Sequence, residues 1–390
     1  MLVRDKQTDQ LSVVALKGFK WMQLWRFLWE RFCIWTANKF TNKENLFTVD
    51  IANTGTDITN IPEFKEADII HLHWINQGML SLGDIKRILE SGKPVVWTMH
   101  DMWPCTGICH YARVCVKYQT ECMHCQYISG GGGSKDLSNR IFHRKAEVFK
   151  GHDITFVTCS KWLRNQAERS ALLRNHNIVN IPNPINTNLF RPLDKIEARK
   201  RLGLPEDGKL ILFASLKITD KRKGIDYMIE SCRLLAQKYP EQGEQCGVVV
   251  FGKLSYQMVS LLPLKVYPLD YISDETRIAD IYNAVDAYVT PSLEDNLPNT
   301  IMEAMACGTP CVGFNVGGIP EMIDHLHNGY VAEYRNAQDF ANGISWVLDA
   351  ENNAELGNMA RRKVEEEYSE NAIAQRYIEV YNKELRRVES

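Results

Sequence analysis

Short apolar runs alternate with longer amphipathic stretches along the whole chain. The runs are rich in β-branched residues and predict buried parallel strands at 67–74, 94–101, 154–160, 209–215, 247–252, 286–292 and 309–314. Between them, stretches such as 224–239 and 273–285 carry apolar residues three and four positions apart, which predicts helices. Because strand, helix and strand alternate in both halves, the pattern predicts an α/β protein with two doubly wound, Rossmann-like domains.

A proline-rich segment separates the two predicted domains. Residues 181–195 contain three prolines, which interrupt the periodicity. The pattern alone leaves open on which domain the last helical stretch packs. We expect an N-terminal domain over 1–184, completed by a helix at about 370–390, and a C-terminal domain over 185–369. Two such domains would leave a cleft at the carboxyl ends of both sheets, where ligands bind in these folds.

Composition narrows the class of protein. The 390 residues are 45% hydrophobic, which suits a folded two-domain chain, and the formal net charge of −2 gives no basic field for nucleic acid. The N-terminus has no apolar signal region and no run of 18 apolar residues occurs, so we expect a cytoplasmic protein with reduced cysteines. Neither a P-loop nor a G-x-G-x-x-G motif is present, which disfavours an NTPase or a nicotinamide enzyme.

The segment SLEDNLPNTIMEAMACGTP carries the most informative chemistry. It contains three acids, Glu294, Asp295 and Glu303. We expect Asn299 or Thr300 to cap a helix, which would place Glu303 in its first turn. Free N–H groups at a helix start bind phosphate and carboxylates accept hydrogen bonds from sugar hydroxyls, so the segment fits a nucleotide diphosphate sugar. The alternative is that Glu303 complements the helix dipole and Asp295 forms a turn.

The same segment resembles the signature of the retaining glycosyltransferases of family 4, which have the GT-B fold of two Rossmann-like domains facing across a cleft. In that signature seven residues lie between an acid and a glutamate, and a helix of small residues and a Gly-Gly turn follow. Here Asp295, Glu303 and AMACGTPCVGFNVGGIPEMI fit it. Similar landmarks follow the family's order: VTCSKWL, IPNPINTNLFRP, DKRKG and NGYVAE. The DNLPN form and HDMWPCTGICHY resemble the subgroup that builds bacterial surface polysaccharides.

The resemblance implies roles for the acids of the segment. Glu303 would bind the ribose of the nucleotide, and Asp295, in place of the family's first glutamate, would hold hydroxyls of the transferred sugar. Backbone amides of Asn296 and Leu297 would face the sugar and the phosphates. Glu294 is one position away from the spacing of the signature, and we expect it to be solvated or structural.

The resemblance also implies basic residues at the diphosphate. Lys217 and Lys223, six positions apart, match the family's basic pair, and two cations would offset the charge on the departing nucleoside diphosphate without a metal ion. Leu269 and Tyr271 lie where the family's loop holds the base. We therefore expect a UDP- or GDP-sugar as donor and no cofactor for catalysis.

Candidate residues for the acceptor half follow two predicted strands of the N-terminal domain. A lone histidine at a strand end is most often structural, but the resemblance implies that His100 and Asp101 face the junction of sugar and phosphate. His73 and Trp74 end the preceding predicted strand, and we expect them on the acceptor side. In retaining transferases the leaving phosphate can itself deprotonate the acceptor, so we assign no catalytic base.

Two further features concern a metal and a membrane. Cys109, Cys115, Cys122 and Cys125 include a Cys-x2-Cys pair, which predicts a structural zinc ion, with buried reduced thiols as the alternative. Residues 17–40 hold four tryptophans and, with Lys43, six basic residues. They predict an amphipathic helix on the inner face of the plasma membrane, where lipid-linked acceptors lie; ordinary helix packing is the alternative.

The start of the chain departs from the family pattern. Family members open with a strand and a Gly-rich turn, whereas MLVRDKQTD resembles their second strand, so we expect the first β–α unit to be absent. The function implied is retaining transfer of a sugar to a glycan or lipid-linked acceptor in capsule, exopolysaccharide or lipopolysaccharide synthesis. Two alternatives remain: a donor-binding but inactive truncated remnant, and a nucleotide-sugar 2-epimerase of the same architecture.

Overall fold

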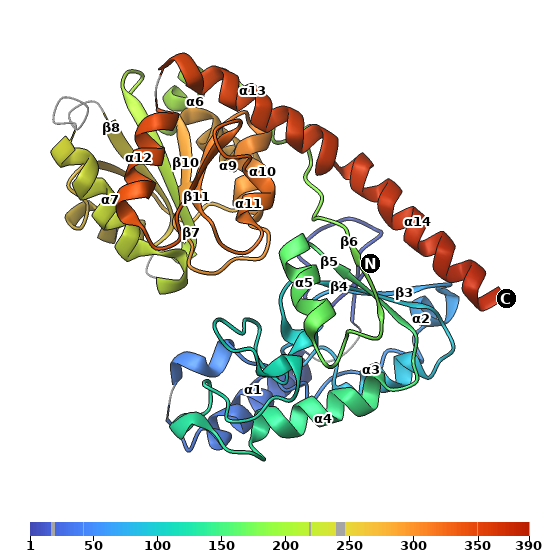
Figure 1. Ribbon diagram of the computed structural model, residues 1–390. Helices are drawn as coiled ribbons and strands as arrows, with labels where there is room; N and C mark the ends of the chain where they lie inside the picture. Colours follow the sequence, from blue (N-terminus) through green and yellow to red (C-terminus); the bar gives the residue numbers. More distant parts are fainter. Residues whose placement is uncertain (17–19, 42, 218–219, 239–245, 349, 390) are drawn as a thin grey trace. The chain divides into compact units, whose positions relative to one another are not determined.

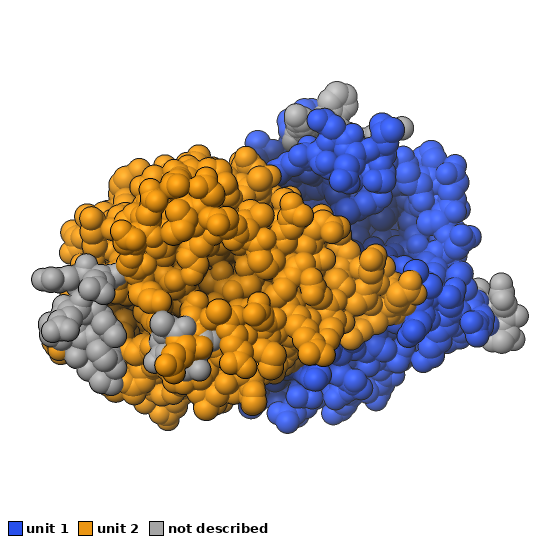
Figure 2. Space-filling view, turned by 90° about the horizontal axis from the view of Figure 1, so that it is seen from above, with its two compact units in different colours: residues 1–180, 378–390 blue, residues 181–377 orange. Residues whose placement is uncertain are grey.

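The computed structural model of the protein (Figure 1) describes all residues except 17–19, 42, 218–219, 239–245, 349 and 390. The chain forms two compact units, coloured separately in Figure 2. Unit 1 comprises Met1–Asn180 together with Ile378–Ser390, and unit 2 comprises Ile181–Tyr377.

Unit 1 is built on a parallel four-stranded sheet. Its strands lie in the order β3 (Ile70–Leu72), β4 (Val95–Met99), β5 (Ile154–Thr158) and β6 (Asn177–Asn180). Every residue of β4 and β5 is buried, as expected for central parallel strands rich in valine, isoleucine and threonine. The helices are α1 (Lys20–Ala37), α2 (Pro62–Glu66), α3 (Leu82–Leu89), α4 (Leu137–Phe149) and α5 (Lys161–Arg169), with 3-10 turns η1 (Lys43–Phe47), η2 (Trp103–Cys105), η3 (Lys117–Gln119) and η4 (Ser129–Gly131).

The first residues of the chain stand apart from that sheet. β1 (Leu2–Val3) pairs in parallel with β2 (Val14–Ala15) and forms a separate two-stranded sheet. MLVRDKQTD thus provides a short strand that does not join the four-stranded sheet.

Unit 2 is built on a parallel six-stranded sheet in the order β12-β11-β10-β7-β8-β9. The strands are β7 (Lys209–Lys217), β8 (Cys246–Lys253), β9 (Lys265–Leu269), β10 (Ala287–Thr290), β11 (Cys311–Phe314) and β12 (Gly329–Ala332). The helices are α6 (Lys195–Leu202), α7 (Ile225–Lys238), α9 (Glu275–Ala284), α10 (Asn299–Ala306), α11 (Ile319–Met322), α12 (Ala337–Val347) and α13 (Ala350–Glu367), with 3-10 turns η5 (Lys221–Lys223) and η6 (Ser255–Ser260). Both units therefore have the doubly wound architecture that the sequence pattern predicts.

The last helix, α14 (Glu370–Glu389), belongs to both units, since its residues from Ile378 onward form part of unit 1. Two of those residues contact the sheet of unit 1. The Thr155 hydroxyl of β5 donates to the buried Glu384 carboxylate at 2.7 Å, and the Tyr381 hydroxyl lies 2.7 Å from Nδ1 of His71 on β3. The end of the chain thus supplies polar partners to strands formed much earlier in the sequence.

Candidate functional site

The acid segment forms a loop after β10 and the start of α10. The helix begins at Asn299 with Pro298 as its N-cap, and no side chain caps it, so the expectation that Asn299 or Thr300 is the cap is wrong. Proline fits this position because its ring fixes φ and it has no N–H to satisfy. Since the helix starts earlier than expected, Glu303 lies in its second turn, and the first turn carries no acid.

Two glycines allow three loops at the carboxyl edge of this sheet to touch. Gly224, after β7, has φ +73° and a Cβ there would lie 1.8 Å from the carbonyl oxygen of Pro291, after β10. Gly317, after β11, has φ +59° and a Cβ there would lie 1.7 Å from the carbonyl oxygen of Asp295. Both positions need the left-handed backbone and the absence of a side chain. The loops that follow β7, β10 and β11 are therefore packed backbone to backbone.

This packing brings Lys223 to Asp295. The lysine Nζ lies 2.5 Å from Oδ2 of Asp295, and the Ser292 hydroxyl donates to the same oxygen at 3.4 Å. Asp295 is 8% exposed, so the ion pair is largely shielded from water. The structure thus joins two residues that the sequence proposes separately, one for the sugar and one for the diphosphate.

The side chain of Glu303 is oriented by a hydrogen bond from a residue buried in unit 2. The hydroxyl of the fully buried Tyr282, on α9, donates to its Oε2 at 2.7 Å. Burial raises the pKa of Glu303, and the hydrogen bond from Tyr282 opposes that rise. The tyrosine therefore both orients the carboxyl group and favours its ionised form.

The other donor-side residues lie at three places. Asn296 and Leu297 are buried in the loop between Asp295 and α10. Leu269 is the last residue of β9, and beyond it the half-exposed Tyr271 ring lies 5.2 Å below the Lys253 ammonium group. β9 is an edge strand, and β7 and β8 separate it from β10. Lys217 ends β7, but its side chain lies outside the described part of the structure.

Asp101 of unit 1 takes part in a buried charged network. Its Oδ2 lies 2.8 Å from Nδ1 of His110 and accepts a hydrogen bond from the Trp74 indole at 3.3 Å. The other ring nitrogen of His110 lies 2.6 Å from Asp50. Burial alone would lower the pKa of His110, but Asp101 and Asp50 outweigh it and raise the pKa to about 10. The imidazole is therefore a cation bridging two carboxylates.

Part of this network was not predicted from the sequence. His110 lies in HDMWPCTGICHY, ten residues after His100, and the sequence suggests it only as a further possible zinc ligand, not as a partner of Asp101. Asp50 comes from a different part of the chain and reaches the site only through folding. By contrast, Trp74 and Asp101, both selected from the sequence, are brought into direct contact.

Three histidines lie in a row beside Asp101. His73 and Trp74 follow β3, which ends at Leu72, rather than ending it as expected. Nδ1 of His73 lies 3.2 Å from Nε2 of His100, and the rings of His71 and His73 are 4.1 Å apart. Nε2 of His71 lies 2.7 Å from the Thr98 hydroxyl. Burial, with the nearby His73 and His100 rings, lowers the pKa of His71 to about 3, so its imidazole is neutral at pH 7.

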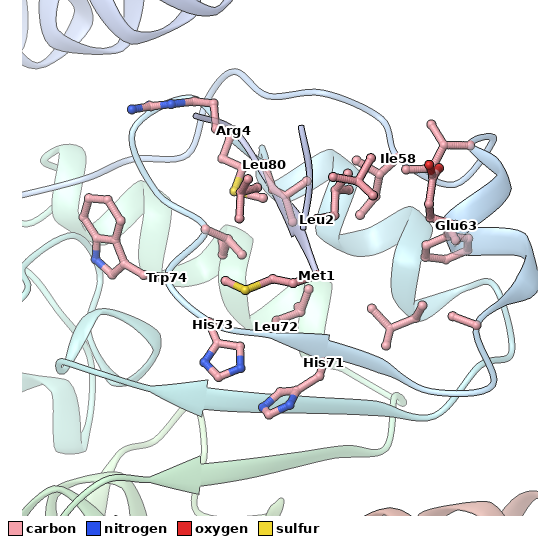
Figure 3. A pocket seen from close by; sticks show the side chains of 18 of the residues that line it. Met1, Leu2, Arg4, Ile58, Glu63, His71, Leu72, His73, Trp74 and Leu80 are labelled. Atoms are coloured by element: carbon pink, nitrogen blue, oxygen red, sulfur yellow. The ribbon is translucent and has the colours of Figure 1, made fainter. Parts of the chain in front are cut away.

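A cavity of about 690 Å³ opens beside these histidines. Its lining is mainly apolar and comes from the first strand and from the region of β3. Figure 3 shows Met1 and Leu2 on the side facing His71 and His73, with Trp74 at one end. Its size suits a small organic molecule or a part of a larger one.

Replacing His71 by glutamine is expected to make unfolding less sensitive to acid. The unfolded chain gains a proton on His71 as the pH falls through about 6.5, whereas the folded chain resists protonation until about pH 3. The contribution of the neutral ring is therefore lost as the pH falls through that window. Denaturant unfolding at pH 7, 5.5 and 4 checks this, and equal losses in both proteins would contradict it.

The four cysteines predicted to bind zinc lie around one small cavity of about 20 Å³, where they are buried or half-buried. Burial raises the pKa of the Cys122 thiol to about 12. Within the described ranges, no three Cys, His, Asp or Glu side chains form a group that could hold a metal ion. Zinc binding by these four cysteines stays an untested prediction.

Comparison with known proteins shows what the second half of the chain is similar to. Residues 194–371 match the family model described as glycosyl transferases group 1. This segment of the chain is therefore similar to the group 1 glycosyl transferases. An uncharacterized glycosyltransferase of Methanocaldococcus jannaschii is 26% identical over 85% of this chain and 89% of its own length. A D-inositol 3-phosphate glycosyltransferase of Thermobispora bispora is 28% identical, over 54% of this chain, and the chain spans about half (51%) of it.

Solved structures show that the chain has a GT-B fold. A glycosyltransferase from Rickettsia africae matches with a TM-score of 0.63 at 17% identity, over 96% of this chain and 85% of that one. HepE from Anabaena, solved in complex with UDP, matches with a TM-score of 0.59 at 18% identity, over 82% of this chain and 79% of that one. The predicted GT-B architecture is thereby confirmed.

Proposed function

We propose that this protein is a retaining glycosyltransferase of the family 4 type. It would transfer a sugar from a nucleotide diphosphate sugar to a glycan or lipid-linked acceptor in capsule, exopolysaccharide or lipopolysaccharide synthesis, at the inner face of the plasma membrane. The similarity to the group 1 glycosyl transferases and the UDP complex of HepE support the reaction class. The observation that carries the proposal is the Lys223–Asp295 pair beside α10, with Glu303 fixed by Tyr282 on the same helix.

Each donor-side residue has a distinct task in this proposal. Oε1 of Glu303 would accept hydrogen bonds from the ribose while Tyr282 holds Oε2. Asp295 would accept hydrogen bonds from hydroxyls of the sugar, and Lys223 would then face the diphosphate. Lys217 would add a second positive charge there. Because these lysines offset the charge that develops on the leaving group, we expect transfer in the presence of EDTA.

The remaining selected residues complete the proposed site. The N–H groups at the start of α10, with the amides of Asn296 and Leu297, would bind the phosphates. Leu269 and Tyr271 would contact the base. In unit 1, we assign His100 and Asp101 to the junction of sugar and phosphate, and the exposed His73 and Trp74 to the acceptor. The neutral histidines near Asp101 would orient hydroxyl groups rather than carry charge.

The test measures donor binding and turnover separately. UDP- and GDP-sugars are supplied with and without a lipid-linked glycan, and release of nucleoside diphosphate is followed. Glu303→Ala is expected to raise the Kd for the nucleotide about tenfold to a hundredfold, because a charged hydrogen-bonded partner of the ribose is lost. Glu230→Ala, an exposed glutamate of α7, should leave the Kd unchanged.

Three outcomes would contradict the proposal. Nucleotide binding without any release would favour the inactive remnant. Release of a free glycal without an acceptor would favour the epimerase. Equal weakening by Glu303→Ala and Glu230→Ala would show that Glu303 does not contact the nucleotide.

A further inference from the structure

Helix α1 turns an aromatic face outward. Its apolar residues recur three and four positions apart, and six of them are between 41% and 64% exposed: Trp21, Leu24, Trp25, Leu28, Trp29 and Phe32. The rings form a continuous row, with centroids 6.1 Å apart between Trp25 and Trp29 and 5.8 Å apart between Trp29 and Phe32. We call these six residues the aromatic face. Exposed apolar residues concentrated in this way mark an interaction surface.

The opposite face of α1 explains why the aromatic face cannot turn inward. Glu30 is fully buried, and its Oε1 accepts hydrogen bonds from the backbone N–H groups of Ile51 and Ala52 at 2.9 and 2.7 Å. Arg31 is 6% exposed and pairs with the buried Asp50. Rolling the helix to bury its tryptophans would separate these charges from their partners, which costs several kcal/mol (about 3–5) per broken pair. The outward orientation is therefore fixed by the buried side.

The charge around α1 favours one kind of partner. Residues 17–43 contain six basic residues and one acid, Glu30, and that acid is fully buried. Arg31 is also buried, so the excess positive charge of the segment comes from its other five basic residues, and the segment has no exposed carboxylate. The exposed Lys39 and Phe40 follow the helix after one buried residue, Asn38. Tryptophan beside lysine and arginine is typical of segments at the boundary of lipid headgroups and acyl chains.

The helix suits the membrane surface rather than its interior. No helix within the described ranges is long and apolar enough to cross a bilayer. α1 itself contains charged residues on its inner face, which remain paired within unit 1. Its geometry is that of a helix lying flat, with one face toward lipid and the other on the protein.

We propose that the aromatic face of α1 binds the surface of an anionic lipid bilayer. The tryptophan and phenylalanine rings enter the headgroup region, and the basic residues of the segment other than the buried Arg31 attract anionic lipid. This binding does not depend on the proposed transfer reaction, and it would hold if the protein acted on another substrate. It gives the protein a means to reach a lipid-linked molecule.

Vesicle binding tests the proposal with the full chain. In co-sedimentation, we expect the protein to bind vesicles containing phosphatidylglycerol, to bind pure phosphatidylcholine more weakly, and to dissociate as salt is raised. Trp25→Ser with Trp29→Ser should lower the partition coefficient about tenfold or more, because two exposed indoles no longer enter the interface. The matched control is Tyr256→Ser with Val259→Ser, two exposed apolar residues of unit 2.

Unfolding midpoints of both double variants show whether the fold is kept, and equal midpoints are expected because all four side chains are exposed. Absence of binding by the unchanged protein would overturn the proposal, as would binding by the tryptophan variant equal to that of the control. Sedimentation velocity supplies the competing result. Concentration-dependent dimers that the tryptophan substitutions abolish, without vesicle binding, would assign the aromatic face to a second copy of the chain.

Discussion

Replacing Asp295 by alanine is expected to lower kcat/KM for sugar transfer by about 10²- to 10³-fold, the usual range for loss of one electrostatic group in an active site. The side chain has two tasks in the proposed site. It would hold hydroxyls of the sugar, and it positions Lys223 through the 2.5 Å ion pair. Without it, the lysine loses the partner that fixes its ammonium group, so orientation and charge compensation fail together. Asp295→Asn should recover part of the orientation but not the ion pair.

The neighbouring Glu294 provides the control. It is half-buried, and the loop uses its backbone oxygen, which accepts a hydrogen bond from Arg222 at 3.5 Å. Glu294→Ala should therefore keep nearly all activity. Combining Asp295→Asn with Lys223→Met should cost much less than the sum of the single changes, because both remove the same ion pair. Equal damage from Glu294→Ala, or strict additivity of the pair, would contradict the assignment.

The second large effect concerns the stability of unit 1. His110→Ala is expected to lower the free energy of unfolding by about 3–5 kcal/mol, since it leaves two buried carboxylates without their shared cation. Asp50 keeps Arg31, whereas the hydrogen bonds that Asp101 keeps within the described residues come from the indole of Trp74 and the backbone N–H of Trp103. The loss should appear as a lower denaturant midpoint.

A matched histidine separates this effect from the removal of any imidazole. His143 on α4 also pairs with a carboxylate, at 2.6 Å from Glu121, but its side chain is 57% exposed. His143→Ala should change the free energy of unfolding by no more than about 1 kcal/mol. Similar destabilisation by both substitutions would show that the buried bridge contributes no more than a surface pair. His110→Gln, which keeps hydrogen bonding without the charge, should fall between the two.

In the four-stranded and six-stranded sheets, the sequence pattern predicts every strand that has a neighbour on both sides. It also predicts one edge strand, β3. In the same two sheets the pattern misses β6, β9 and β12, and each is an edge strand of its sheet. Their residues, NIVN, KVYPL and GYVA, are partly exposed or interrupted by polar residues and proline. A sequence pattern detects burial on both faces, so it finds the centre of a parallel sheet more readily than its edges.

The candidate site was predictable only where its residues share one segment. The seven-residue interval selects Asp295 and Glu303 because both lie within one loop and helix. The contact between Lys223 and Asp295 depends on Gly224 and Gly317, whose missing side chains let separate loops meet. The bridge from Asp50 to His110 joins residues 60 positions apart, and only the packed fold brings them together.

The position of the last helix has a consequence for synthesis on the ribosome. Unit 1 contains the first 180 residues, yet it also needs Ile378 onward, including the partners of Thr155 and His71. The unit that emerges first is therefore the unit that is finished last. While unit 2 is being translated, His71 on β3 and Thr155 on β5 lack their partners Tyr381 and Glu384. A chaperone can bind the sheet of unit 1 at this stage, because its strands are present but these contacts are not yet formed. A single cut between the units would likewise leave unit 1 without its final turns, so separate expression requires residues 378–390 to be joined to residue 180 through a linker.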